Sequence, residues 1–285
     1  MTLAALWVAF LAMFALTALA PAATALWLRL RRDVPIRVFE IAAGFYLLNL
    51  AVQVPIFRLI GNRPGLLGPV LAPLLAPAIY SLSEESLRYL SFRAGRTMRG
   101  SRHADGALMA GLGHGGMEAL IFAFVLTSTV VSVTFAPASL KTQGIDATQT
   151  ANGVIVSGAV YTVSRLAAIV CHVGFATLCV LAYRRSLAFL PIAVLAHFAV
   201  NASTSRLQAV GGPWWVLVFV AWAALFGLLA MWVRHEGWLR RSPPPPASPG
   251  TPPTTRGRVE AYSPRHSGFR LARNASTPSL KSCDM

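Results

Sequence analysis

Negative charge is scarce in this sequence: only 10 of its 285 residues are Asp or Glu, against 25 Lys and Arg. Cysteine is scarce too, with three residues and no Cys-x-x-Cys pair, so we expect neither a disulfide framework nor a thiolate metal site. Charged residues make up 12% of the chain and hydrophobic residues 55%, and the mean hydropathy is +0.57. This composition predicts a polytopic membrane protein rather than a soluble domain.

Apolar stretches of about 20 residues, the length that crosses the hydrocarbon layer as a helix, recur along the chain. They lie near residues 3–28, 36–58, 66–92, 106–135, 154–183, 187–206 and 212–233. We therefore predict an all-α fold, a polytopic membrane helix bundle of about seven transmembrane helices within residues 1–235. No basic region precedes the first stretch, which favours a retained helix over a cleaved secretory signal.

The arginines indicate an orientation, because cytoplasmic loops collect Lys and Arg. They gather after the first, third, fifth and seventh stretches, which predicts an N-out, C-in, multi-pass protein of the inner or plasma membrane. The net charge of +15 lies mostly in these loops and the tail, so we expect no nucleic-acid partner. Residues 236–285 are basic and Pro-rich without apolar periodicity, and we predict a disordered cytoplasmic tail, either resting on anionic lipid or solvated.

Four of the apolar stretches contain ionisable residues, which are costly in lipid and normally face a bundle interior or a water-filled cavity. These residues are Glu84, Glu85 and Arg88; His114 and Glu118; Arg165 and His172; and His197 with Asn201. Within each stretch the spacing of three, four or seven residues places the group on one helix face. Glu84, His114, His172 and His197, one from each stretch, lie about 13–18 Å along a helix from the charges at the predicted cytoplasmic ends. The pattern predicts one site in the cytoplasmic half of the bilayer.

The residue types in this layer suit hydrolysis. A carboxylate helped by an imidazole can take a proton from water, while a second imidazole and an Asn amide can stabilise the oxyanion formed at a peptide carbonyl. Neither a Ser–His–Asp nor a Cys–His arrangement stands out, so we expect water to be the nucleophile. Taken singly, a His or Asn in a spanning helix often only joins helices, and the glycines around His114 either pack helices or admit a substrate. These glycines are Gly111, Gly113, Gly115 and Gly116.

The ordered set of motifs resembles the YhfC-like family of bacterial intramembrane peptidases, related in pattern to the CAAX (CPBP) and PrsW-type membrane proteases. The resemblance covers roughly residues 1–235 and leaves the tail unmatched. The motifs that carry it are Glu84-Glu85-Ser-Leu-Arg88-Tyr, Gly111-Leu-Gly-His114-Gly-Gly-Met-Glu118, Arg165 with His172, and His197-Phe-Ala-Val-Asn201. The double-Glu and His-x-x-x-Asn elements are short, and the ordered set is more specific than either.

By this resemblance, Glu84 would be the base that activates water, Glu85 a supporting acid, and His114 a second contact to the water. His197 and Asn201 would stabilise the oxyanion. The chain departs from the CAAX-protease pattern at two points. Two residues separate the second glutamate from its arginine where that pattern has three, and a glycine-flanked histidine replaces the Phe-x-x-x-His motif.

The sequence leaves one alternative for the cofactor and two for the function. Zinc could be held by His114, His172 and His197 with one glutamate, leaving a position open for water. No His-Glu-x-x-His segment is present, and we expect no obligatory metal. The rivals to a peptidase are a proton or metal-ion carrier and a noncatalytic scaffold resembling the gamma-secretase subunit APH-1. The expected partners are membrane lipids and a membrane-protein or lipopeptide substrate.

Overall fold

The computed structural model describes residues 3–61, 68–142, 144, 146–212 and 214–240, all of which belong to one compact unit. Helices account for nearly all of these residues, and no strand occurs among them. The first predicted span is a continuous helical stretch made of α1 (Leu3–Phe14), a π-helical turn η1 (Ala15–Leu19) and α2 (Ala20–Arg32). Residues 241–285 lie outside the described part, so the predicted disorder of the tail stays a prediction.

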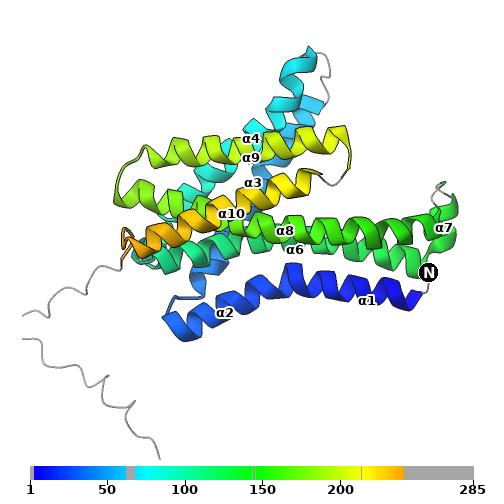
Figure 1. The fold of residues 1–285 in the computed structure, drawn as a ribbon, viewed down its shortest axis with the longest axis horizontal. Helices are drawn as coiled ribbons and strands as arrows, with labels where there is room; N and C mark the ends of the chain where they lie inside the picture. The colour runs from blue at the N-terminus through cyan, green and yellow to red at the C-terminus, as the bar shows by residue number, and fades with distance from the viewer. Residues whose placement is uncertain (1–2, 62–67, 143, 145, 213, 241–285) are drawn as a thin grey trace, which may run out of the picture. The chain divides into compact units, whose positions relative to one another are not determined.

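Two long helices, α6 (Ala104–Phe135) and α8 (Ala147–Arg184), lie side by side (Figure 1). Each begins at a side-chain cap: the His103 ring accepts from the Gly106 N–H, and the Asp146 carboxylate accepts from the Gln149 N–H. The short helix α7 (Pro137–Thr142) precedes α8. This pair forms the wall against which the remaining helices pack.

The other long helices surround the pair and bring the predicted site together. The helix α3 (Arg37–Gly61) packs on α6, and α10 (Trp214–His235) packs on α8. The polar helices α4 (Gly68–Ser91) and α9 (Phe189–Val210) pack on each other and on α8. A short helix, α5 (Gly95–Gly100), follows α4.

Five of the helical stretches among the described residues are long and apolar enough to cross a membrane, in agreement with the all-α membrane bundle. They are Leu3–Arg32, Arg37–Ile60, Ala104–Phe135, Gln149–Arg184 and Trp214–His235. The predicted third and sixth spans correspond to α4 and α9, which have 24 and 22 residues but carry the polar groups of the site. That α4 and α9 cross the membrane stays a prediction, as does the orientation.

Candidate active site

The structure brings the polar faces of α4, α6, α8 and α9 into one cluster, which we call the buried polar layer. Its members come from segments far apart in sequence and contact one another directly. All are buried except Glu118, whose side chain is 19% exposed. The buried polar layer consists of Glu84, Glu85, Arg88, His114, Glu118, His172 and His197.

Arg88 lies at the centre of this layer and is 2% exposed. Its Nε lies 3.2 Å from Glu85 Oε2, and its NH2 lies 3.9 Å from Glu84 Oε2. On the other side its NH1 donates to the backbone carbonyl of His172 at 3.1 Å. The guanidinium group thus joins α4 to α8 while neutralising part of the charge of the two glutamates, as a buried charge requires.

The contacts of His172 fix its tautomer. Its Nδ1 lies 2.8 Å from Arg88 NH2, and because an arginine can only donate, this nitrogen must accept. The proton of the neutral ring therefore lies on Nε2, which donates to Glu118 Oε2 at 2.5 Å. Both nitrogens are engaged, so His172 holds α4, α6 and α8 in register.

Glu118 pairs across helices rather than with His114 on its own helix. Its Oε1 accepts from Arg165 NH1 at 2.5 Å, and its Oε2 contacts His172. The sequence placed Glu118 and His114 on one face of α6, and the structure separates their contacts: His114 faces Glu84, while Glu118 faces α8. Arg165, in turn, lies over the ring of Phe122 at 4.2 Å.

Glu84 is the point on which two imidazoles converge. Its Oε2 lies 3.3 Å from His114 Nε2 and 4.0 Å from His197 Nε2. The other nitrogen of His197, Nδ1, lies 2.8 Å from Glu85 Oε1 and donates to it, since the carboxylate accepts. Phe175 stacks on the His197 ring with centroids 4.5 Å apart. His197 is therefore held by Glu85 and Phe175 with Nε2 directed toward Glu84.

The glycines that flank His114 are positions where helices approach closely. A Cβ at Gly111 would lie 2.5 Å from the Val173 Cα, and one at Gly115 would lie 2.8 Å from the His172 ring. A Cβ at Gly113 would collide with the backbone of Phe39 on α3. The structure thus supports the packing role for these glycines: they let α6 approach α8 and α3, which places His114 inside the layer.

A cavity of about 520 Å³, the polar cavity, opens onto this layer. Glu84, Glu118, His172 and His197 line it, together with Asn201. From there the cavity follows one face of α9 through the polar side chains of Thr204, Ser205 and Gln208. This stripe gives water a polar path to the carboxylate of Glu84.

The carboxylates of the buried polar layer outnumber the guanidinium groups that pair with them. Three carboxylates, those of Glu84, Glu85 and Glu118, face two guanidinium groups, those of Arg88 and Arg165. When all three carboxylates are ionised, one negative charge is uncompensated in a medium of low dielectric constant. A proton on an imidazole or a bound cation at Glu84 would offset it.

A comparison with known protein families finds a match over most of the chain. Residues 16–223, which include every member of the buried polar layer, match the family described as YhfC intramembrane metalloprotease. The chain belongs to this family. No curated protein and no solved structure matches it. The YhfC match agrees with the resemblance seen in the motifs, and its description favours the zinc alternative over our expectation that no metal is needed.

The residues of this YhfC-family chain fit a divalent cation. Glu84, His114 and His172 each offer a ligand atom, and these atoms lie within 4.8 Å of one another. Imidazole and carboxylate are ligands that zinc accepts, and catalytic zinc sites use three such protein ligands. His172, however, has both nitrogens hydrogen-bonded, whereas Nε2 of His197 is directed toward Glu84. Glu84 and His114 are thus two suitable ligands, and two imidazoles compete to be the third.

Sequence reasoning missed the aromatic residues that position the imidazoles. Tyr46 packs edge-on against His114, with centroids 4.9 Å apart, and Phe175 stacks on His197. The i+3 spacing of Phe175 from His172 placed it on the polar face of α8 and could have identified it. Nothing in the sequence indicated Tyr46, because its helix carries no ionisable residue at that depth.

Proposed function

We propose that this chain is an intramembrane peptidase that hydrolyses a peptide bond of a membrane protein or lipopeptide at the buried polar layer. The observation that carries the proposal is the convergence of His114 and His197 on Glu84, at the wall of a cavity with a polar path for water. A layer that only joined helices would need no cavity at Glu84.

Each residue has a role in this proposal. Glu84 takes a proton from the attacking water, and His114, buried beside it, holds the carboxylate by a contact of 3.3 Å. The Asn201 amide faces the same cavity and donates to the oxyanion. Glu85 does not contact the substrate; it orients His197 through Nδ1. Arg88 and Glu118 fix His172 and with it the helix register.

A divalent cation would be held by Glu84, His114 and His197, and Glu84 would then act as a ligand in place of its role as the free base. The anchoring of His197 Nδ1 on a carboxylate is the arrangement that metal-binding histidines use, and it leaves Nε2 for the metal. When bound, such a cation supplies Lewis-acid chemistry, polarising a carbonyl or lowering the cost of deprotonating water. Without a cation, a protonated His197 would use the same nitrogen to donate to the oxyanion.

The proposal is tested with purified full-length protein in nanodiscs. We would incubate wild type, Glu84→Gln and Glu40→Gln with a panel of membrane proteins and lipopeptides and identify new peptide termini by mass spectrometry. Glu40 is an exposed glutamate in the first turn of α3 and serves as the matched control. Products from wild type and Glu40→Gln, but not from Glu84→Gln, are expected. Ion flux in liposomes without any product would favour the carrier instead.

A further inference from the structure

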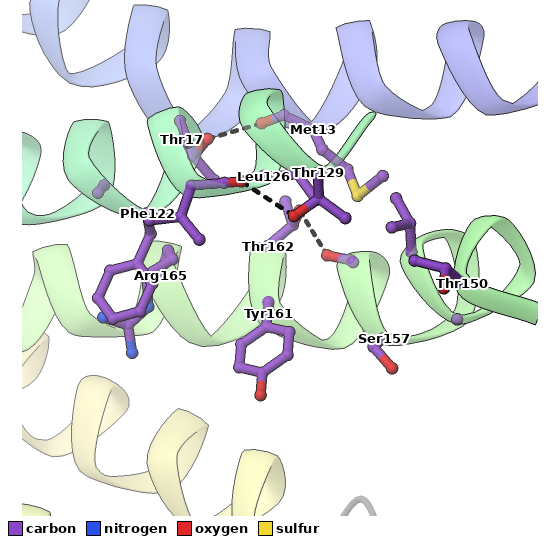
Figure 2. Close-up of a pocket in the computed structure, with 16 residues that line it drawn as sticks. Met13, Thr17, Phe122, Leu126, Thr129, Thr150, Ser157, Tyr161, Thr162 and Arg165 are labelled. Carbon is purple, nitrogen blue, oxygen red and sulfur yellow. Dashed lines mark hydrogen bonds between the residues drawn. The ribbon is translucent and has the colours of Figure 1, made fainter. Parts of the chain in front are cut away.

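A second cavity of about 520 Å³, the apolar cavity, lies between the first helical stretch, α6 and α8. Figure 2 shows its two ends, with Arg165 beside Phe122 at one and Thr150 at the other. These ends are about 22 Å apart along α8, so the cavity is elongated. One wall includes Thr17 of the π-helical turn η1, and π-helical turns occur frequently at functional sites.

The walls of this cavity are mostly apolar, and their polar side chains other than threonine are Ser157, Tyr161 and Arg165. Four threonines line it, and every one donates its hydroxyl to a carbonyl four residues earlier on its own helix. These are Thr17, Thr129, Thr150 and Thr162. The other lining residues are mostly apolar, including Met13, Leu126 and Val154. A cavity of this size and lining suits a hydrocarbon ligand.

A whole transmembrane helix does not fit. A helix about 10 Å wide that crosses a 30 Å hydrocarbon layer occupies roughly 2,400 Å³, several times the volume of the cavity. A single extended hydrocarbon chain suits the elongated, mostly apolar shape. The occupant is therefore a chain rather than a helix.

The cavity shares a wall with the polar cavity. Phe122, Tyr161 and Arg165 line both, and Arg165 also contacts Glu118 of the buried polar layer. A ligand with its chain in the apolar cavity would therefore carry its head group toward Glu84. This continuity favours the chain of a substrate over that of a membrane lipid.

Arg165 also holds a donor that the described residues do not satisfy. Its Nε–H is buried and has no hydrogen-bond partner among them, and the ring of Phe122 covers the guanidinium group. A buried donor without an acceptor is destabilising, so an oxygen acceptor from a ligand would be stabilising here. Phe122 itself is 45% exposed, so it lies at an open side of the cavity.

We propose that the apolar cavity binds the fatty-acyl chain of an acylated peptide substrate, with the ester or amide carbonyl of that chain accepting from Arg165 Nε–H. This inference rests on the proposed function and names the substrate class. An alkyl chain attached by a thioether lacks this carbonyl and should bind less tightly.

The test is photolabelling, which needs no turnover. The probe is an N-palmitoyl peptide with a diazirine in the chain, added to the full-length protein in nanodiscs, and labelled segments are identified by mass spectrometry. We expect labels within residues 13–17, 119–129 and 150–165, equally in wild type and Glu84→Gln. A matched peptide with a thioether-linked alkyl chain should label about tenfold less, the equivalent of one buried hydrogen bond.

Two glycine-to-leucine variants provide a matched control, one inside the cavity and one outside it. Gly153 lines the cavity, and a Cβ there meets nothing within 4 Å, so Gly153→Leu fills the space without a backbone clash. Gly44 on α3 is equally open and lines neither cavity, so Gly44→Leu is matched to it. We expect Gly153→Leu to reduce labelling about tenfold, because the leucine would crowd the bound chain, and Gly44→Leu to leave it unchanged.

The outcomes separate this inference from the proposed function. Undiminished labelling of Gly153→Leu, or equal labelling by the thioether peptide, would overturn the acyl-chain site. Equal labelling by a diazirine phospholipid would make the cavity a membrane-lipid site, and would also overturn it. Cavity labelling by the palmitoyl probe with no cleavage of any peptide would support the site and contradict the peptidase.

Discussion

Arg88 contacts His172 twice, through NH1 to the backbone carbonyl at 3.1 Å and through NH2 to Nδ1 at 2.8 Å. The same guanidinium group lies beside both glutamates of α4. One buried cation thus sets the tautomer of an imidazole on α8 and compensates the carboxylates on α4. The position of the base and the register of the helices depend on the same side chain.

Removing Arg88 should destabilise the protein. Arg88→Met leaves Glu85 without its cation in a fully buried position, and breaking a buried ion pair typically costs about 3–5 kcal/mol. Denaturant unfolding of the detergent-solubilised protein would measure this free energy. Arg29→Met is the control, because Arg29 pairs with Asp33 at an exposed site and should cost less than about 1 kcal/mol. Equal effects of the two variants would contradict the central role of Arg88.

Glu118→Gln should reduce turnover while the protein stays folded. The amide keeps the shape of the carboxylate but removes the charge that holds Arg165 and the Nε2–H of His172. We expect up to about a 100-fold loss in kcat, because His172 lines the polar cavity beside Glu84 and small misplacements near a reacting centre can cost that much. Separate measurement of KM and kcat is the readout, and we expect the change to fall on kcat. An effect on stability alone would show a merely structural role.

Gly111→Ala should destabilise the packing of α6 on α8. The new Cβ would lie 2.5 Å from the backbone of Val173, which cannot move without shifting α8. Overpacking of this kind costs about 1–3 kcal/mol. Gly44→Ala, in open space on α3, should instead be neutral or slightly stabilising because alanine favours the helix. Thermal unfolding of both variants checks the prediction, and a fully stable Gly111→Ala would refute the packing role.

The metal content of two histidine variants should show whether His172 or His197 is the third metal ligand. We expect His197→Gln to lower the zinc stoichiometry measured by inductively coupled plasma analysis, and His172→Gln to retain it, because both nitrogens of His172 are already bonded. A chelator should remove the metal and the activity together, and added zinc should restore both. Retained metal in His197→Gln with loss in His172→Gln would reverse the assignment of the third ligand.

The helical fold and the clustering of the polar residues could be predicted because both follow from local rules, although Asn201 lines the cavity beside the layer instead of belonging to it. Apolar length marks a spanning helix, and a charge that is costly in lipid marks the inward face. The pairing within the layer could not be predicted, since the partner of Glu118 depends on how α6 and α8 are rotated and on the close approach that Gly111 permits. For the same reason Tyr46, an aromatic residue on a helix without polar groups at that depth, gave no signal.

The most direct test of the central claim is the initial rate of cleavage of one substrate obtained from the panel, compared between wild type, Glu84→Gln and Glu40→Gln in the same nanodiscs. A general base typically accelerates a reaction about 10²–10⁴-fold. The cleavage rate of Glu84→Gln should therefore fall by at least about 100-fold, while Glu40→Gln retains the wild-type rate. A Glu84→Gln protein that is correctly folded and cleaves at the wild-type rate would contradict the assignment of Glu84 and of the layer as a hydrolytic site.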